Sequence, residues 1–216
     1  MAISTMMKKL SMATAGAAVV ALGVVGSAQA ATFRESGDAG QTLDTAQNVG
    51  GGITQILGNY QNSNADLFSF LWNGGAFSAT ASASFDTQLF LFNSEGRGVI
   101  ANDDDISIGG GSRIATTLSQ GLYYLGISGY NNDPVSRGGS IFTDNWSGVQ
   151  TPTGSGGASP LSGWTGGGSN GSYQINISET ASVPEPASTL GLLVLGSLGA
   201  GSMLKRKQQQ KATVKA

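Results

Sequence analysis

The fold is decided by the stretch Asp66-Leu67-Phe68-Ser69-Phe70-Leu71-Trp72, in which aromatic side chains alternate with Leu and Ser. In an extended segment, such alternation gathers the aromatic rings on one face. Asn73-Gly74-Gly75 follows, a combination typical of a tight turn. Residues 76–83 then resume the alternation, with Phe and Ala on one face. The pattern predicts two half-buried strands joined by a turn.

Similar short segments continue on both sides of this pair, and Gly, Asn, Asp or Ser separates each from the next. The expected strands are residues 53–60, 66–72, 76–83, 88–93, 99–102, 113–119, 122–128 and 172–179. No part of residues 31–183 shows helical periodicity over about eleven residues. Short strands at this spacing predict an all-β fold, an antiparallel sandwich or barrel, over residues 31–180.

Residues 131–171 interrupt the strand pattern with Gly, Ser, Thr, Pro and Asn, a composition typical of a flexible linker. Large apolar side chains are nevertheless spread through this segment, and a linker has no need of them. They favour a long loop held against the sandwich by Ile141, Phe142, Trp146, Leu161 and Trp164.

The N-terminal residues 1–30 are typical of a secretory signal peptide, with two lysines before an apolar run rich in Ala and Gly. Ala28 and Ala30 are the small residues that a signal peptidase recognises, so we expect cleavage before Ala31. The alternative is an uncleaved N-terminal anchor.

The C-terminal end contains a second targeting segment. Val183-Pro184-Glu185-Pro186 precedes an apolar run at residues 190–204, and Lys205-Arg206-Lys207 closes it. Residues 187–204 carry no charge, and a helix of that length spans about 27 Å, enough to cross a thin hydrocarbon core. Basic residues beside a membrane span stay on the inner side, which predicts a cytoplasmic tail at residues 208–216.

This order of parts closely resembles the PEP-CTERM sorting signal of Gram-negative bacteria and cyanobacteria, over residues 183–207. The resemblance implies that exosortase, a membrane-embedded protease, recognises the motif and processes the tail. It implies a precursor anchored in the inner membrane, and then a location at the cell surface or in the extracellular matrix with exopolysaccharide as a partner. A permanent membrane anchor without processing is the alternative that the same hydropathy permits.

Charge and composition exclude several functions. Residues 31–183 contain four arginines, no lysine and twelve carboxylates, a net charge of −8 against −2 for the whole chain. Nucleic acids and anionic lipids require a basic surface, so neither is expected as a partner, whereas calcium or a neutral glycan suits this one. The chain contains no Cys and no His, which excludes thiol proteases, Ser-His-Asp triads and His-ligated zinc or copper.

A second resemblance covers about residues 38–178. It rests on four runs in order: NADLFSF at residues 64–70, FDTQLFLFN at 85–93, ANDDD at 101–105 and GLYYLGISGY at 121–130. Together they resemble the bacterial pre-peptidase C-terminal domain, which implies a jelly-roll-like β-sandwich of the kind appended to secreted proteases or found alone on exported proteins. No catalytic domain accompanies the resemblance here.

The best candidate metal site consists of Asn102, Asp103, Asp104 and Asp105, with Asp86 one strand earlier. Calcium takes six to eight oxygen ligands, and clustered carboxylates in a loop supply them. Calcium-binding members of the resembling family support this assignment. The spacing fits neither an EF-hand nor a Gly-rich nonapeptide repeat. The alternative is a solvated turn, because Asp readily caps its own backbone.

Enzymatic function is not expected. Asp86 and Glu95 are conceivable as a glycosidase pair, which requires carboxylates about 5 to 9 Å apart, but each fits a turn better. Several aromatic residues offer either a stacking platform for sugars or a core and lid: Tyr123, Tyr124, Tyr130, Trp146 and Trp164. The sequence therefore predicts a non-enzymatic, exported cell-envelope or matrix protein. The alternative is a calcium-dependent glycan- or protein-binding module at the cell surface.

Overall fold

The computed structural model describes residues 31–62, 64–109, 111–143 and 147–179. The expected signal peptide, the sorting motif, the apolar run at 190–204 and the tail at 208–216 lie outside the described residues. Within the described ranges, no helix is both long and apolar enough to span a bilayer.

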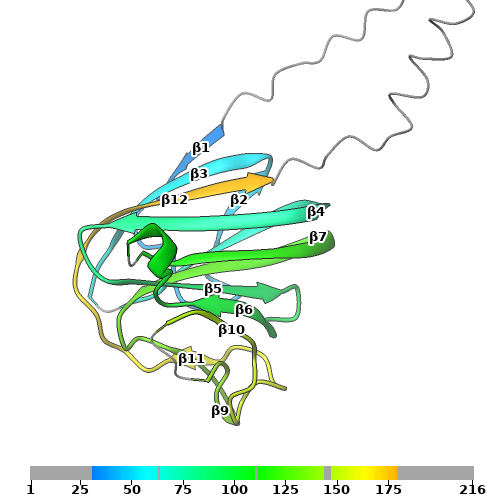
Figure 1. The fold of residues 1–216 in the computed structure, drawn as a ribbon, viewed down its shortest axis with the longest axis vertical. Helices are drawn as coiled ribbons and strands as arrows, with labels where there is room; N and C mark the ends of the chain where they lie inside the picture. The colour runs from blue at the N-terminus through cyan, green and yellow to red at the C-terminus, as the bar shows by residue number, and fades with distance from the viewer. Residues whose placement is uncertain (1–30, 63, 110, 144–146, 180–216) are drawn as a thin grey trace, which may run out of the picture.

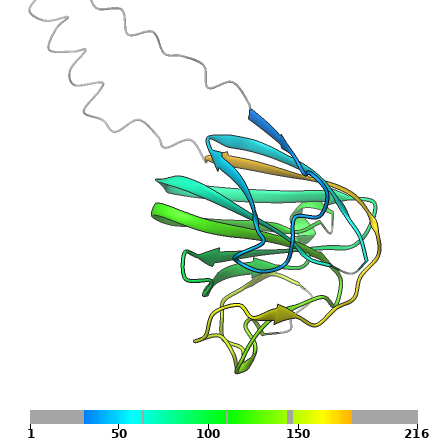
Figure 2. The ribbon, with the colours of Figure 1, turned by 180° about the vertical axis from the view of Figure 1, so that it is seen from behind.

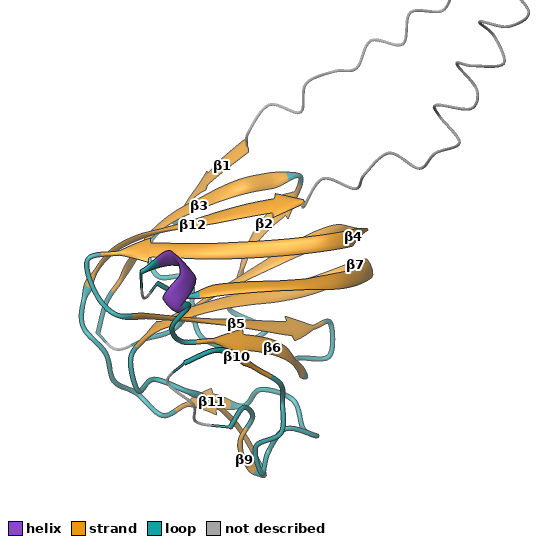
Figure 3. Cartoon of the chain, in the orientation of Figure 1, coloured by secondary structure: helices purple, strands orange, loops and turns teal. Residues whose placement is uncertain are grey.

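The described residues form β-strands and one short 3-10 helix, η1, at Ile106–Ile108 (Figure 3). This confirms the predicted all-β fold. The strands are β1 Ala31–Arg34, β2 Gln47–Gly51, β3 Ile53–Tyr60, β4 Asp66–Ala83, β5 Thr87–Asn93, β6 Gly98–Asn102, β7 Arg113–Gly129, β8 Pro134–Ser136, β9 Gly139–Ser140, β10 Val149–Gln150, β11 Gly163–Trp164 and β12 Gly171–Glu179.

β4 and β7 form one long antiparallel ribbon that folds back on itself. Along a straight strand, Phe70 and Phe77 would lie about 23 Å apart. Their ring centroids are only 5.5 Å apart, so β4 bends sharply between them. Gly74 and Gly75 lie at the bend with φ of +92° and +101°, a backbone region that favours glycine. The turn predicted at residues 73–75 is thus a bend within a strand, because β7 continues to pair with β4 on both sides of it.

The bent ribbon gives the sandwich its two layers (Figure 1). One layer contains β1, β3, β12, the second half of β4 and the first half of β7. The other contains β2, the first half of β4, the second half of β7, β5, β6 and β10. All strand pairs are antiparallel except β1 with β3 and β2 with β4. The sequence did not predict β1 and β2, which are short and rich in polar residues or Gly.

The main core lies between the layers. Phe68, Phe70 and Trp72 from one half of β4 pack with Phe77 from the other half, and the Trp72 and Phe77 rings meet edge to face with centroids 5.1 Å apart. Each such ring removes a large apolar area from water, which makes this contact a main source of stability.

A second core lies on the outer side of β5 and β6. Ile141, Phe142 and Leu161 from the 131–171 segment cover Phe90 and Phe92 there. β5 is therefore buried on both faces, which explains its unbroken apolar run. The segment is more regular than the predicted loop, since β8, β9 and β11 form a small sheet and β10 extends the main one. Trp146 lies outside the described residues.

The described chain enters and leaves the sandwich at the same end (Figures 1 and 2). Thr32 in β1 and Asn176 in β12 both pair with Gln55 in β3, so they lie about 10 Å apart. The opposite end, which we call the far end, carries the turns at residues 35–41, 61–62, 64–65, 84–86, 103–109 and 111–112.

Candidate functional site

The structure brings together three of the five residues predicted to bind calcium. Carboxylate oxygens of Asp86, Asp103 and Asp104 lie within 4.8 Å of one another at the far end. Asp103 is buried, Asp104 is half-buried and Asp86 is exposed. Partial burial and the charge of Asp104 raise the pKa of Asp86.

The other two predicted ligands serve the local backbone. Asp105 Oδ1 accepts hydrogen bonds from Ser107 N at 2.9 Å and Ser107 Oγ at 2.6 Å, and so caps η1. These bonds lower the pKa of Asp105. Asn102 Oδ1 accepts a hydrogen bond from Arg113 N at 3.2 Å, which fixes the start of β7.

A second acidic cluster, which the sequence analysis missed, consists of Glu35, Asp38 and Asp66. Their carboxylate oxygens also lie within 4.8 Å of one another. Glu35 follows β1, Asp38 lies in the next turn, and Asp66 begins β4. One sequence signal was present: Asp66 occupies the same face of the strand as Phe68 and Phe70, the face that turns to the core.

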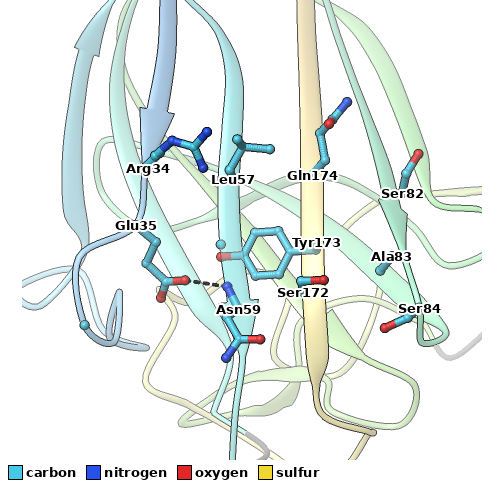
Figure 4. Close-up of a pocket in the computed structure, with 12 residues that line it drawn as sticks. Arg34, Glu35, Leu57, Asn59, Ser82, Ala83, Ser84, Ser172, Tyr173 and Gln174 are labelled. Atoms are coloured by element: carbon cyan, nitrogen blue, oxygen red, sulfur yellow. Dashed lines mark hydrogen bonds between the residues drawn. The ribbon is translucent and has the colours of Figure 1, made fainter.

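Backbone and amide donors hold two of these carboxylates in place. Glu35 Oε1 accepts a hydrogen bond from Ala39 N at 2.9 Å, and Glu35 Oε2 accepts one from Asn59 N at 2.7 Å (Figure 4). Asp38 Oδ1 accepts a hydrogen bond from Gly40 N at 3.1 Å. The pKa of Glu35 is raised, mainly because its carboxylate is partly buried. Backbone N–H groups of the turn after β1 therefore donate hydrogen bonds to the acidic side chains of the same segment.

Asp66 differs from both neighbours. It is only 2% exposed, and within the described residues its Oδ2 has no hydrogen-bond partner. Burial raises the pKa of Asp66 to about 8, and the charges of Glu35 and Asp38 add to the shift, while the nearby Tyr173 hydroxyl offsets part of it. A buried carboxyl without a donor is costly unless a proton or a cation neutralises it.

Tyr173 reaches this cluster by crossing β3 at Gly58. A Cβ at position 58 would overlap the Tyr173 hydroxyl and Glu35 Oε2, so only glycine leaves room for them. Burial and the surrounding carboxylates raise the pKa of Tyr173, which keeps its hydroxyl protonated. Within the described residues, the Tyr173 hydroxyl forms no hydrogen bond of good geometry, although it lies close enough to Asp66 to lower the pKa of that carboxyl. The cluster thus contains two buried polar groups whose bonding is incomplete.

The fold does not assemble the other sites considered from the sequence. Asp86 and Glu95 lie at opposite ends of β5, about 20 Å apart, too far for a glycosidase pair. Glu95 instead forms a salt bridge with Arg97 at 2.9 Å. Tyr123 packs against the main core, whereas Tyr124 and Trp164 both pack against the second core, so the aromatic residues are divided between two cores.

Comparison with protein families decides the nature of the C-terminal segment. Residues 182–207 match the family model of the PEP-CTERM protein-sorting motif. The chain carries a PEP-CTERM sorting signal. The match includes the residues predicted for it, Val183-Pro184-Glu185-Pro186 and Lys205-Arg206-Lys207. This confirms the resemblance and implies an exported protein, anchored in the membrane as a precursor and sorted by an exosortase.

No curated protein matches the chain significantly. Among solved structures, the chain is similar to the pre-peptidase C-terminal domain of collagenase from Bacillus anthracis, with 12% identity, a TM-score of 0.37, and coverage of 61% of this chain and 93% of that one. It is also similar to periplasmic inhibitors of g-type lysozyme. For the Aeromonas hydrophila inhibitor the identity is 11%, the TM-score 0.32, and the coverage 68% and 96%. For the Salmonella Typhimurium inhibitor the identity is 15%, the TM-score is 0.28, and the coverage is 62% of this chain and 100% of that one.

Proposed function

We propose that this PEP-CTERM protein is a non-enzymatic component of the cell surface or extracellular matrix, whose sandwich binds calcium at its far end. Signal peptidase and exosortase are its processing partners, and the inner membrane holds it before processing. Exopolysaccharide is its expected surrounding. The absence of His and Cys from the chain and the separation of Asp86 from Glu95 support a role without catalysis.

The observation that carries the calcium proposal is the buried Asp66 carboxyl beside Glu35 and Asp38. The three side chains offer only oxygen ligands, and clustered carboxylates are what calcium prefers. Within the described residues, no ion pair to Lys or Arg neutralises them. A bound divalent cation would supply the partner that Asp66 Oδ2 lacks.

Asp86, Asp103 and Asp104 form a second candidate calcium site. It is the weaker one, because Asp105, the next carboxylate in the loop, is occupied in capping η1.

Scanning calorimetry of the full chain in detergent, with millimolar calcium or with chelator, tests the calcium proposal. At a hundredfold excess over the dissociation constant, calcium adds about 2.7 kcal/mol to the stability of the folded state. Asp66→Asn keeps the size of the side chain and removes the carboxylate that would bind the cation, so it abolishes this gain. Asp44→Asn, at an exposed position outside both clusters, is the matched control and retains it. Indistinguishable melting curves for the wild type with and without calcium reject the site.

The sorting proposal has its own test. Replacing Pro184 and Glu185 with Ala leaves the apolar run at 190–204 intact and removes the motif that exosortase recognises. In a host that contains exosortase, the variant accumulates at full length in the membrane fraction while the wild type is processed. If the two proteins have the same mass and fractionate in the same way, the sorting proposal fails and the C-terminal segment is a simple membrane anchor.

A further inference from the structure

The layer that contains β1, β3, β12 and the second half of β4 has a hollow on its outer face, with a volume of about 720 Å³ (Figure 4). Its size falls within the range of ligand-binding pockets. The lining is polar apart from a few small or apolar groups. It consists of Arg34, Glu35, Gly37, Leu57, Gly58, Asn59, Ser82, Ala83, Ser84, Ser172, Tyr173 and Gln174.

The hollow is rich in hydrogen-bonding groups that the protein itself does not use. Within the described residues, no side-chain hydrogen bond is formed by Asn59, Ser82, Ser84 or Ser172, and all four are exposed. Such a row of hydroxyl and amide groups matches a ligand that carries many hydroxyls. Leu57 is half-buried among them and offers one apolar contact.

Arg34 determines the charge of the ligand. It is exposed at the end of β1 and, within the described residues, makes no ion pair. A guanidinium binds a carboxylate through two parallel hydrogen bonds, which is stronger and more specific than a bond to a hydroxyl. The hollow thus combines one carboxylate-binding group with several hydroxyl-binding groups.

We propose that this hollow binds a saccharide chain that carries carboxylates, such as a polyuronate. Arg34 pairs with a sugar carboxylate, and Asn59, Gln174 and the serines bind the sugar hydroxyls. The inference rests on the proposed extracellular role, in which exopolysaccharide surrounds the protein, and it names the site and the class of ligand.

The cation site lies at the edge of the same hollow. Glu35 belongs to both, because its carboxylate is part of the acidic cluster and also lines the hollow. The acidic cluster at this edge repels an anionic ligand, and a bound divalent cation lowers the net negative charge there. Calcium therefore strengthens the binding of the acidic saccharide.

The position of the hollow suits this role. Its residues lie where β1 ends, β12 begins and the second half of β4 ends, which is the half of the layer nearer the far end. The described chain enters and leaves the sandwich at the other end. A ligand in the hollow therefore does not meet the chain termini of the sandwich.

Isothermal titration calorimetry of the full chain in detergent tests the inference with trigalacturonate and with its methyl ester, which has the same shape and no charge. In millimolar calcium, we expect trigalacturonate to bind at least about tenfold more tightly than the ester. Arg34→Gln removes this preference. Arg137→Gln changes an exposed arginine outside the hollow and leaves the preference intact. In chelator, the affinity for trigalacturonate falls.

Three results would overturn the inference. Equal affinity for the acid and the ester would show that charge is not recognised. Equal losses in the Arg34 and Arg137 variants would place the ligand elsewhere. Failure of both saccharides to bind the calcium-loaded chain would remove the saccharide site. The calcium site is measured separately by titration with calcium alone, so its failure is distinguishable from these three.

Discussion

The two acidic clusters at the far end of the sandwich contain the same kind of side chain but differ in origin. Asp103 and Asp104 are consecutive in the sequence, and Asp86 joins them from another turn. Asp105, the next residue, caps η1 and does not take part. We call Asp86, Asp103 and Asp104 the turn cluster.

Glu35, Asp38 and Asp66 come from two separate segments, which the parallel pairing of β1 with β3 and the position of β4 bring together. We call this the inter-strand cluster. Its Asp66 is buried by the fold. Beside the turn cluster, the Asp105 carboxylate is used to cap its own backbone, whereas in the inter-strand cluster the buried Asp66 requires a proton or a cation.

The pH dependence of stability gives the largest expected difference between the clusters. The pKa of Asp66 is raised from 3.8 to about 8, so the folded state binds its proton more tightly than the unfolded chain does. Its stabilising contribution is complete below pH about 4 and is lost as the pH rises through about 8. Without calcium, stability falls over that window in the wild type more than in Asp66→Asn. Chemical denaturation from pH 4 to pH 9 measures the free energy of unfolding of both proteins. The same pH dependence in the wild type and in Asp66→Asn would contradict the raised pKa.

Gly58→Ala breaks the inter-strand cluster sterically. The added methyl overlaps the Tyr173 hydroxyl and the Glu35 carboxylate, so the variant loses about 1–3 kcal/mol of stability and its response to calcium weakens. Gly51→Ala is the control, because the nearest atom to its Cβ is 3.6 Å away, an ordinary contact. Equal stability of the two variants in urea denaturation would show that Tyr173 and Glu35 do not need this gap.

Asp104→Asn tests the turn cluster and has the smallest expected effect. Its carboxylate is half-buried beside the exposed Asp86, so the substitution changes stability by less than about 0.5 kcal/mol and preserves the calcium-dependent gain. Differential scanning fluorimetry with and without calcium measures both. A loss of the calcium response in this variant, with Asp66→Asn unaffected, would reverse the ranking of the clusters.

Local pattern predicted most of the fold. The alternation of Phe68, Phe70 and Trp72 identified an aromatic face, and that face is in the main core. Gly74 and Gly75 marked a change of direction, but periodicity cannot distinguish a turn from a bend within a paired ribbon. Large apolar residues in the Gly-rich segment 131–171 indicated that this segment packs against the sandwich, and Ile141 and Phe142 do so.

The inter-strand cluster could not be predicted with the same means. It depends on β1, a four-residue strand with no clear pattern, and on a parallel pairing that no local signal reveals. Conversely, the run Asp103-Asp104-Asp105 is conspicuous in the sequence, yet the fold directs Asp105 to η1 and away from its neighbours. Consecutive Asp residues in the sequence thus indicated a turn more reliably than they indicated a group of metal ligands.

The most direct test of calcium binding at the inter-strand cluster is the number of protons released. Titration calorimetry at pH 7 in two buffers of different ionisation enthalpy, on the full chain in detergent, gives this number. Because the pKa of Asp66 is about 8, its carboxyl is mostly protonated at pH 7 and must lose that proton to bind a cation. The wild type is predicted to release about one proton per calcium, and Asp66→Asn to bind weakly and release none. Tight calcium binding without proton release, unchanged in Asp66→Asn, would contradict the account.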